Sequence, residues 1–304
     1  MKKVLIVGGT GLVGSLLTQS LLEKGYQVSY LSRSAEPKNG CESLVWNVKK
    51  QFIDSKAFEG IDFLVNLAGA GIADERWTDE RKKELLESRT QGTKLLINAL
   101  LQRKHQIKAV VQASAVGYYG SDFTQTFTET SPAAHDFMAT ICEQWELACQ
   151  GFSTQLGLRT AILRIGVVLG RNGGALEKLV QPFKFGAGAV LGSGRQYVSW
   201  IHEQDLSNMI VFALENQQVS GIYNAVAPAP VTNQILIQSI GKALKKPVLP
   251  IKVPEFALKL ALGEMAQVVL GSQRVSCQKI SEAGFTFSFA TPDLALKNLL
   301  HEPF

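Results

Sequence analysis

The sequence is poor in cysteine and in long apolar runs, and both shortages narrow the class of protein. The 304 residues include four cysteines, Cys41, Cys142, Cys149 and Cys277, with no Cys-x-x-Cys pair. So few thiols exclude a disulfide framework and supply no metal-ligand pattern. No stretch approaches the about 18 consecutive apolar residues that a membrane-spanning helix needs. We therefore expect a soluble protein from a reducing compartment, without a metal site.

Concentrated charge is also missing. The chain has 31 lysines and arginines against 26 aspartates and glutamates, which gives a formal net charge of +5. These charges are scattered, whereas a nucleic-acid-binding protein gathers them in a run or stripe. The apolar run after Lys2 and Lys3 ends at Gly8, too early for a signal peptide. We expect a cytoplasmic protein with a small-molecule substrate, no nucleic-acid or membrane partner, and homodimerisation left open.

Apolar runs alternate with helical patterns through the first half of the chain. Alternation of this kind predicts a parallel sheet with right-handed crossovers, so the expected fold is α/β, a Rossmann doubly wound parallel sheet. Strands are expected at 3–7, 27–31, 63–67, 109–113, 160–165 and 222–225, and helices at 79–101, around Met138 and at 205–215.

The regular alternation ends near residue 170, where glycines become frequent. Residues 1–228 are predicted to form the nucleotide-binding domain, with an inserted glycine-rich segment at about 171–199 that belongs to a substrate lobe. From about residue 232 the pattern is helical and interrupted by prolines. Residues 229–304 are therefore predicted to form a small, mostly helical C-terminal lobe.

A glycine-rich segment, Gly8-Gly-Thr-Gly-Leu-Val-Gly14, follows the first expected strand and opens the first helix. A tight turn, close approach to a pyrophosphate and packing of helix on strand each require a residue without a side chain. The helix N-terminus then presents free N–H groups to the anion. The predicted cofactor contacts in this segment are Gly8, Thr10, Gly11, Leu12, Val13 and Gly14.

The end of the second expected strand indicates which dinucleotide is bound. A carboxylate at this position would hold the ribose 2′-hydroxyl of NAD, but the sequence has Ser32 and Arg33 instead. An arginine can neutralise and hydrogen-bond a 2′-phosphate, and serine leaves room for it. We therefore expect NADP(H) in preference to NAD, the alternative being that Arg33 is an ordinary exposed arginine.

Four motifs, in order along nearly the whole chain, resemble those of the extended short-chain dehydrogenase/reductases of the epimerase/dehydratase type. They are Gly8–Gly14, Asn66-Leu-Ala-Gly69, Ala113-Ser-Ala-Val-Gly-Tyr-Tyr-Gly120 and Trp200-Ile-His-Glu-Gln-Asp205. Further segments, including Arg76-Trp-Thr78 and Gly192-Ser-Gly-Arg-Gln196, resemble the atypical subgroup called epimerase family proteins, which carry a C-terminal extension. The resemblance implies a Rossmann domain and a nicotinamide cofactor, and it supplies no particular substrate.

The resemblance also implies further contacts. It places Leu67, Ala68 and Gly69 beside the adenine or ribose, and it places Arg89 and Glu84 near the cofactor on the long helix. The alternative for the last two is a charged helix surface with ion pairs. Arg195, in a glycine-rich loop, corresponds to a position where relatives contact a nucleotide diphosphate and is the predicted substrate-binding residue.

In active relatives a tyrosine hydroxyl exchanges a proton with the substrate, and a lysine four residues later lowers its pKa and holds the nicotinamide ribose. None of the six tyrosines here has a lysine four residues later. Met138 and Cys142 occupy those positions if Glu146 is aligned with the glutamate after the motif. Met138 has no proton to give, and Cys142 is more typical of an apolar core.

The remaining candidates for proton transfer are Tyr118 and Ser114. Alignment on Tyr119 places Ala115 at the relatives' Ser/Thr position, whereas alignment on Tyr118 places Ser114 there. Tyr118 can act as a displaced acid, or it packs the strand end, as aromatic residues commonly do. His202 is expected to orient its loop rather than to shuttle protons.

Two functions therefore stay open. The leading one is an NADP(H)-dependent oxidoreductase or epimerase acting on an unidentified small molecule, for which a nucleotide sugar is one candidate. The alternative is a non-catalytic protein that senses NADP(H) or serves as an interaction module.

Overall fold

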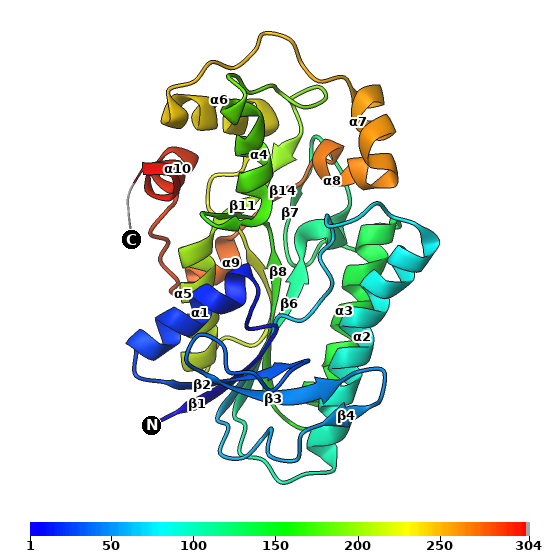
Figure 1. Cartoon of the computed structure of the whole chain (residues 1–304), viewed down its shortest axis with the longest axis vertical. Helices are drawn as coiled ribbons and strands as arrows, with labels where there is room; N and C mark the ends of the chain where they lie inside the picture. The colour runs from blue at the N-terminus through cyan, green and yellow to red at the C-terminus, as the bar shows by residue number, and fades with distance from the viewer. Residues whose placement is uncertain (302–304) are drawn as a thin grey trace.

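A computed structural model describes residues 1–301 of the chain and contains one large sheet flanked by helices (Figure 1). The eight strands are parallel to their neighbours except for the β3/β4 pair. This arrangement confirms the predicted Rossmann-like α/β fold. The strand order is β12 (Gly221–Ala225), β8 (Arg159–Ile165), β6 (Ala109–Ala115), β5 (Phe63–Asn66), β1 (Lys3–Val7), β2 (Gln27–Ser32), β3 (Glu42–Asn47) and β4 (Phe52–Ile53).

Two helix pairs cover the two faces of the sheet (Figure 1). They are α1 (Leu12–Glu23) with α5 (Glu203–Glu215), and α2 (Asp79–Leu101) with α3 (Phe137–Thr154). Side chains alternate along a strand, so β1 contributes to both cores. Val4 and Ile6 join the core on the α1/α5 side. Leu5 and Val7 join the core on the α2/α3 side. Burial of each such side chain contributes about 1.5–3 kcal/mol.

The helices that carry the site begin at side-chain caps. Thr78 accepts a hydrogen bond from the Arg81 backbone N–H at the start of α2, whose bounds match the prediction of 79–101. Asp136 accepts from the Ala139 N–H at the start of α3, with an N···O distance of 2.9 Å. Such caps satisfy N–H groups that the helix itself leaves unpaired.

A second layer of helices lies above the sheet in Figure 1. It contains α4 (Gly174–Lys184), α6 (Asn233–Leu244), α7 (Glu255–Leu262), η2 (Gly263–Ala266), α8 (Gln267–Leu270) and α10 (Pro292–His301). Of these, α4, α6 and α10 form a core with the buried Trp200. Two short ribbons join this layer to the sheet, β9 (Val167–Gly170) with β11 (Trp200–His202), and β10 (Tyr197–Val198) with β13 (Val231–Thr232).

Part of the expected C-terminal lobe returns to the nucleotide-binding domain. Strand β14 (Arg274–Val275) pairs with β7 (Thr126–Phe127), and α9 (Gln278–Glu282) follows it. Ile280 and Phe285 then join the core beneath α5. Packing therefore crosses the division predicted at residue 228. Within residues 1–301 no helix is both long and apolar enough to cross a membrane.

Candidate functional site

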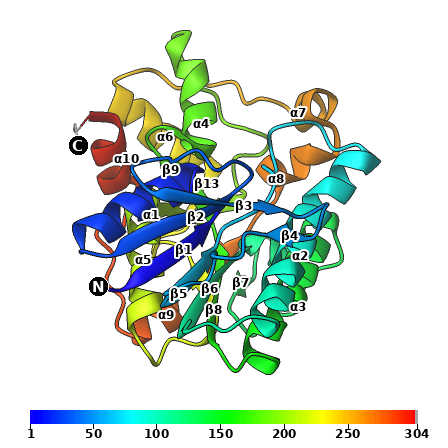
Figure 2. The ribbon, with the colours of Figure 1, turned by 60° about the horizontal axis from the view of Figure 1, so that its bottom comes forward.

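Three predicted segments meet at the carboxyl end of β1. Val7 pairs with Leu31 of β2 on one side and with Asn66 of β5 on the other. Strands β2 and β3 are added on one side of β1, and β5, β6, β8 and β12 are added on the other side. Open α/β sheets bind ligands at such a switch point. Figure 2 shows β5, β1 and β2 side by side. The glycine segment, the Ser32–Arg33 pair and the Leu67–Gly69 segment therefore lie next to one another.

The glycine segment forms a cradle that side chains would fill. Gly8 has φ +83°, and a Cβ there would lie 3.0 Å from the carbonyl carbon of Leu67. A Cβ at Gly14 would lie 2.5 Å from the Gly8 carbonyl oxygen. Gly9, which the sequence argument did not single out, meets the Tyr30 ring, since a Cβ there would approach to 2.3 Å. The segment thus fits a dinucleotide pyrophosphate, which requires close backbone approach.

The N-terminus of α1 supplies the charge for this cradle. Gly11 is its N-cap and offers no side-chain hydrogen bond. The first backbone N–H groups of the helix therefore remain available to an anion, and the helix dipole favours negative charge there. Thr10 is exposed beside them, and Val13 is half-buried against the core. The Leu12 side chain instead lies near Gly170 and Gly174, so Leu12 offers the cofactor its backbone.

Ser32 and Arg33 lie where β2 ends, next to the glycine segment. The Ser32 hydroxyl and the backbone of Ser34 hydrogen-bond each other, which makes a tight turn. Arg33 is exposed. No carboxylate occupies the strand end, so the local charge is positive. This arrangement suits a phosphate better than a ribose hydroxyl.

Asn66 of β5 and Arg89 of α2 hold the Leu67–Gly69 segment in place. Asn66 is buried; its amide donates to Thr93 and Gln112, and its oxygen accepts from the Ala68 N–H. Arg89 reaches the segment from α2, donating to the Ala70 carbonyl at 3.0 Å and to the Leu85 carbonyl at 2.9 Å.

Arg89 is therefore committed to backbone carbonyls beside the predicted cofactor contacts. A Cβ at Gly69 would lie 2.9 Å from its guanidinium carbon. The guanidinium also stacks over Trp145 at 5.1 Å, and burial lowers its pKa. Arg89 shapes the segment that borders the cofactor, and direct contact with the nucleotide stays a prediction.

Glu84 has a different setting from Arg89. Its carboxylate accepts from Arg81 at 2.6 Å, and its side chain is 59% exposed. Arg81 in turn donates to the Gly71 carbonyl. This is the ion-pair arrangement given above as the alternative, and the structure does not bring the Glu84 carboxylate to the Leu67–Gly69 segment.

Met138 and Cys142, which the alignment on Glu146 assigns to the relay positions, are packed against a glycine. Met138 and Cys142 both lie against Gly117, where a Cβ would meet the Met138 methyl at 3.0 Å and the Cys142 sulfur at 3.7 Å. Burial raises the pKa of the Cys142 thiol to about 12, with the charge of Glu146 adding to the effect. The thiol is therefore protonated and inert near neutral pH.

Ser114 belongs to a buried polar network beside this cluster. Its hydroxyl donates to Glu146 at 2.7 Å, and Glu146 accepts two hydrogen bonds of 2.8 Å from Arg164. Arg164 also donates to the Tyr119 hydroxyl, which donates to Asn224. Because side chains alternate along β6, the Ala115 side chain lies on the other face of the sheet from Ser114.

In the sequence, Glu146 served only to align the helix with the relatives' motif, and Arg164 was not identified as a site residue. A signal was present, because Arg164 interrupts the apolar run of β8, and a buried charge requires a partner. Tyr118 belongs to the same assembly, since the Arg164 guanidinium lies 3.4 Å from the centre of its ring. Its ring also packs against the core on the α1/α5 side.

His202 and Arg195 lie apart from the relay positions. His202 is buried, its Nδ1 accepts from the Gln204 N–H, and its Nε2 faces Asn298 at 3.2 Å. Burial lowers its pKa to about 4, so it is neutral and orients its loop as expected. Arg195 is exposed on the β10 approach, and its substrate role stays a prediction.

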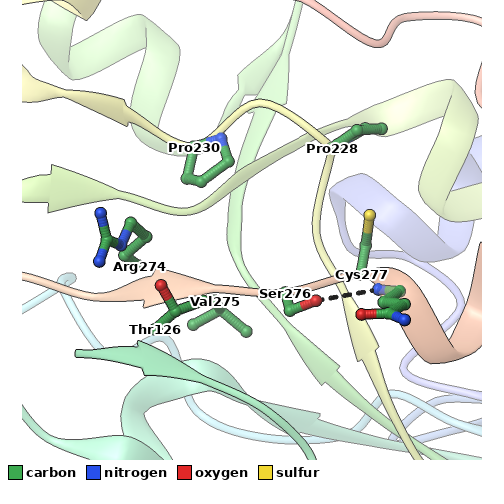
Figure 3. A pocket seen from close by; sticks show the side chains of 8 residues that line it. Thr126, Pro228, Pro230, Arg274, Val275, Ser276 and Cys277 are labelled. Atoms are coloured by element: carbon green, nitrogen blue, oxygen red, sulfur yellow. Dashed lines mark hydrogen bonds between the residues drawn. The ribbon is translucent and has the colours of Figure 1, made fainter.

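A cavity of about 400 Å³ opens elsewhere, between β7, β14 and the loop after β12 (Figure 3). Arg274, Ser276 and Pro230 line it, and none of the predicted site residues does. A second cavity of about 350 Å³ lies between α2 and α3. Across residues 1–301 no group of three or more His, Cys, Asp or Glu side chains is placed to hold a metal ion.

A doubly wound sheet with a glycine cradle at its switch point defines a Rossmann dinucleotide-binding protein. The profile of the NAD dependent epimerase/dehydratase family matches residues 4–225, and that of a domain of unknown function, DUF1731, matches residues 253–299. The chain belongs to the NAD dependent epimerase/dehydratase family, which confirms the resemblance inferred from the motifs.

Relatives match over the whole chain. An epimerase family protein of Staphylococcus aureus is 37% identical over 303 residues, covering 99% of this chain and 100% of that protein. The human epimerase family protein SDR39U1, whose crystal structure is described with NADPH, is 34% identical with a TM-score of 0.88 and 98% coverage of both chains. A UDP-glucose 4-epimerase from Thermus thermophilus shares the fold, with a TM-score of 0.74, 19% identity and 98% coverage of both chains.

Proposed function

We propose that this chain binds NADP(H) in preference to NAD. The pyrophosphate would lie on the glycine segment at the N-terminus of α1, and the 2′-phosphate would lie at Ser32 and Arg33. Support comes from the missing carboxylate at the end of β2 and from the exposed guanidinium of Arg33. An arginine fork binds phosphate through charge-assisted hydrogen bonds. The NADPH described with the human relative is consistent with this choice.

We further propose that the nucleotide acts as a bound ligand whose redox state the protein reports, and not through the family's tyrosine relay. The observation that carries this proposal is the packing of Met138 and Cys142, the residues that the alignment on Glu146 assigns to the relay, against Gly117. Bound nicotinamide supplies hydride chemistry, but redox at a sugar hydroxyl also needs a proton acceptor within hydrogen-bond reach. Neither the Met138 thioether nor the protonated Cys142 thiol can accept a proton at neutral pH.

An oxidoreductase or epimerase acting on a small molecule, such as a nucleotide sugar, is the second candidate. It is favoured by the Arg164 guanidinium at 3.4 Å from the centre of the Tyr118 ring, because this cation–π contact holds a candidate proton donor in a fixed position. If Tyr118 is the acid, Tyr118→Phe abolishes turnover and leaves NADPH affinity unchanged.

The two functions differ in what happens to NADPH. The protein would be mixed with NADPH and a panel of carbonyl compounds and nucleotide sugars, while nicotinamide absorbance and sugar composition are followed. The ligand role predicts saturable binding without substrate-dependent oxidation or epimerisation. It also predicts hydrogen-exchange patterns that differ between the NADPH and NADP⁺ complexes. Sustained turnover of any substrate would reject the ligand role, and identical exchange patterns would reject sensing.

A further inference from the structure

Five large apolar side chains of the upper layer are exposed. They are Phe185 at 88%, Leu249 at 49%, Ile251 at 75%, Phe256 at 73% and Leu260 at 78% exposure, and we call them the apical patch. In Figure 1 the connection from α6 to α7 arches over the upper end of the molecule and leads into α7. Four of the five residues lie on that connection or on α7 itself.

Helix α7 turns its apolar stripe outward. None of its residues is buried, and Phe256 and Leu260 are four residues apart, so they share one side of the helix. Glu255 and Lys259 form the neighbouring stripe and face each other at 3.9 Å. A helix that belonged only to a soluble domain would turn Phe256 and Leu260 toward the core.

The patch is presented on a fixed frame. The Leu249 N–H donates to the Gly188 carbonyl at 2.8 Å, which holds the connection against the segment after α4. Phe185 lies in that segment. At the other end, Arg76 donates to the Leu260 carbonyl at 2.7 Å and ties α7 to the loop before α2. The exposed side chains therefore belong to an ordered surface.

Positive charge surrounds these apolar side chains. Residues 242–262 contain five exposed lysines, Lys242, Lys245, Lys246, Lys252 and Lys259. Lys242 pairs with Asp293 and Lys259 with Glu255, so the excess positive charge comes from the other three. Lys252 donates to the Ser193 carbonyl and Lys246 to the Phe183 carbonyl, so both remain close to the patch. The complementary surface is both apolar and negatively charged.

We propose that the apical patch docks the protein on an anionic lipid surface. Protruding Phe, Leu and Ile side chains flanked by lysines suit the boundary between headgroups and acyl chains. A partner helix would instead require a groove, and neither cavity described above is lined by the patch residues. The docking is peripheral, and it differs from the sequence-based expectation of no membrane partner.

The test is co-sedimentation of the full chain with phosphatidylcholine vesicles, with and without phosphatidylglycerol. The protein should bind the mixed vesicles and dissociate from them at high salt. Its affinity for phosphatidylcholine alone should be lower by about fivefold for each lysine that contacts the anionic surface. The double substitution Phe256→Gln and Leu260→Gln should weaken binding by about tenfold or more. NADPH affinity should not change, since neither residue borders the glycine segment.

Phe52→Gln with Leu101→Gln is the matched control. Those side chains are each 50% exposed on β4 and at the end of α2, and their loss should leave vesicle binding unchanged. Equal sedimentation with both vesicle types, no sedimentation, or an unaffected α7 variant would overturn the proposal. So would self-association of the free protein that the α7 variant abolishes, because a second copy would then cover the patch.

Discussion

Arg33 is the single side chain on which the cofactor preference depends. Arg33→Ala should weaken NADPH binding by about tenfold to a hundredfold, since charge-assisted hydrogen bonds contribute about 1.5–3 kcal/mol. NADH binding should change little, because NADH has no 2′-phosphate. The measurement is calorimetric or fluorescence titration of both nucleotides.

Arg195→Ala is the control for that substitution, because Arg195 is also exposed and lies on the β10 approach. It should leave NADPH affinity unchanged. Equal weakening of NADPH and NADH by Arg33→Ala would mean that Arg33 acts on a part shared by both nucleotides, contrary to the assignment.

The Glu146–Arg164 pair is the main buried charge interaction beside the relay positions. Glu146→Ala should lower the free energy of unfolding by about 3–5 kcal/mol, because it leaves the Arg164 guanidinium buried without its partner. Urea denaturation measures the effect. Glu143→Ala, at an exposed position on the same helix, should change it by no more than about 0.5 kcal/mol. If Glu146→Ala lowered the free energy of unfolding by no more than about 0.5 kcal/mol, the ion pair would not hold β8 to α3.

The glycine cradle could be predicted from the sequence, whereas the Glu146–Arg164 ion pair could not. The roles of Gly8 and Gly14 follow from spacing within one short segment after one strand. Glu146 and Arg164 lie on different elements, α3 and β8, and only the packing of helix on sheet brings them together. The hydrogen bond of Ser114 was not predicted for the same reason, because its acceptor Glu146 lies on α3. Its role in proton transfer stays a prediction.

Helix α1 and its turn respond differently to a methyl group at two glycines. Gly14→Ala should destabilise the protein and abolish NADPH binding, because the added Cβ lies 2.5 Å from the Gly8 carbonyl oxygen. At Gly11 φ is −77° and the nearest atom to an added Cβ is 3.6 Å away. Gly11→Ala should therefore keep the melting temperature and lower only NADPH affinity, if the pyrophosphate approaches this backbone. Normal affinity in Gly11→Ala would place the pyrophosphate elsewhere.

Helix α5 begins at His202, and its cap makes stability depend on pH. The pKa of His202 in the folded protein is lowered to about 4 from an ordinary value of 6.5, chiefly by burial. The unfolded chain therefore binds the proton first as the pH falls below about 6.5, and stability declines toward pH 4. His202 should account for about 2 kcal/mol of lost stability between pH 7 and pH 5.

The substitution His202→Asn isolates that contribution, because asparagine also caps helices and does not titrate. Urea denaturation at both pH values should show a smaller pH difference in the variant than in the parent. An unchanged difference would mean that His202 is not the titrating group.

The elements found from sequence were those with long patterns. The 79–101 helix has a threonine cap, two acidic residues in its first turn and a long periodic stretch, and its bounds agree with α2. Strand β4 and the two-residue ribbons were missed, because two residues show no alternation. The six-residue strand β3 was missed as well. The ribbon β7/β14 joins segments nearly 150 residues apart, which no local pattern indicates.

The molecule as a whole combines a glycine cradle at the switch point of its sheet with a packed Met138–Cys142 pair at the positions predicted for the relay. The loop after the predicted cofactor segment is tied to the upper layer, since Lys178 of α4 donates to the Ala73 carbonyl and Arg76 donates to the Leu260 carbonyl. A change at the nucleotide therefore has a short physical route to α4 and α7. That connection is what a sensing role requires.

The family and fold followed from motif order, but the reaction did not follow, because none of the tyrosines has the lysine four residues later that would define it. Cofactor choice is thus the most direct test of the account. Wild-type protein would be titrated with NADPH and with NADH at the same ionic strength. The account predicts that NADPH binds at least about tenfold more tightly, as charge-assisted contacts to a phosphate require. Equal affinities, or tighter binding of NADH, would contradict it.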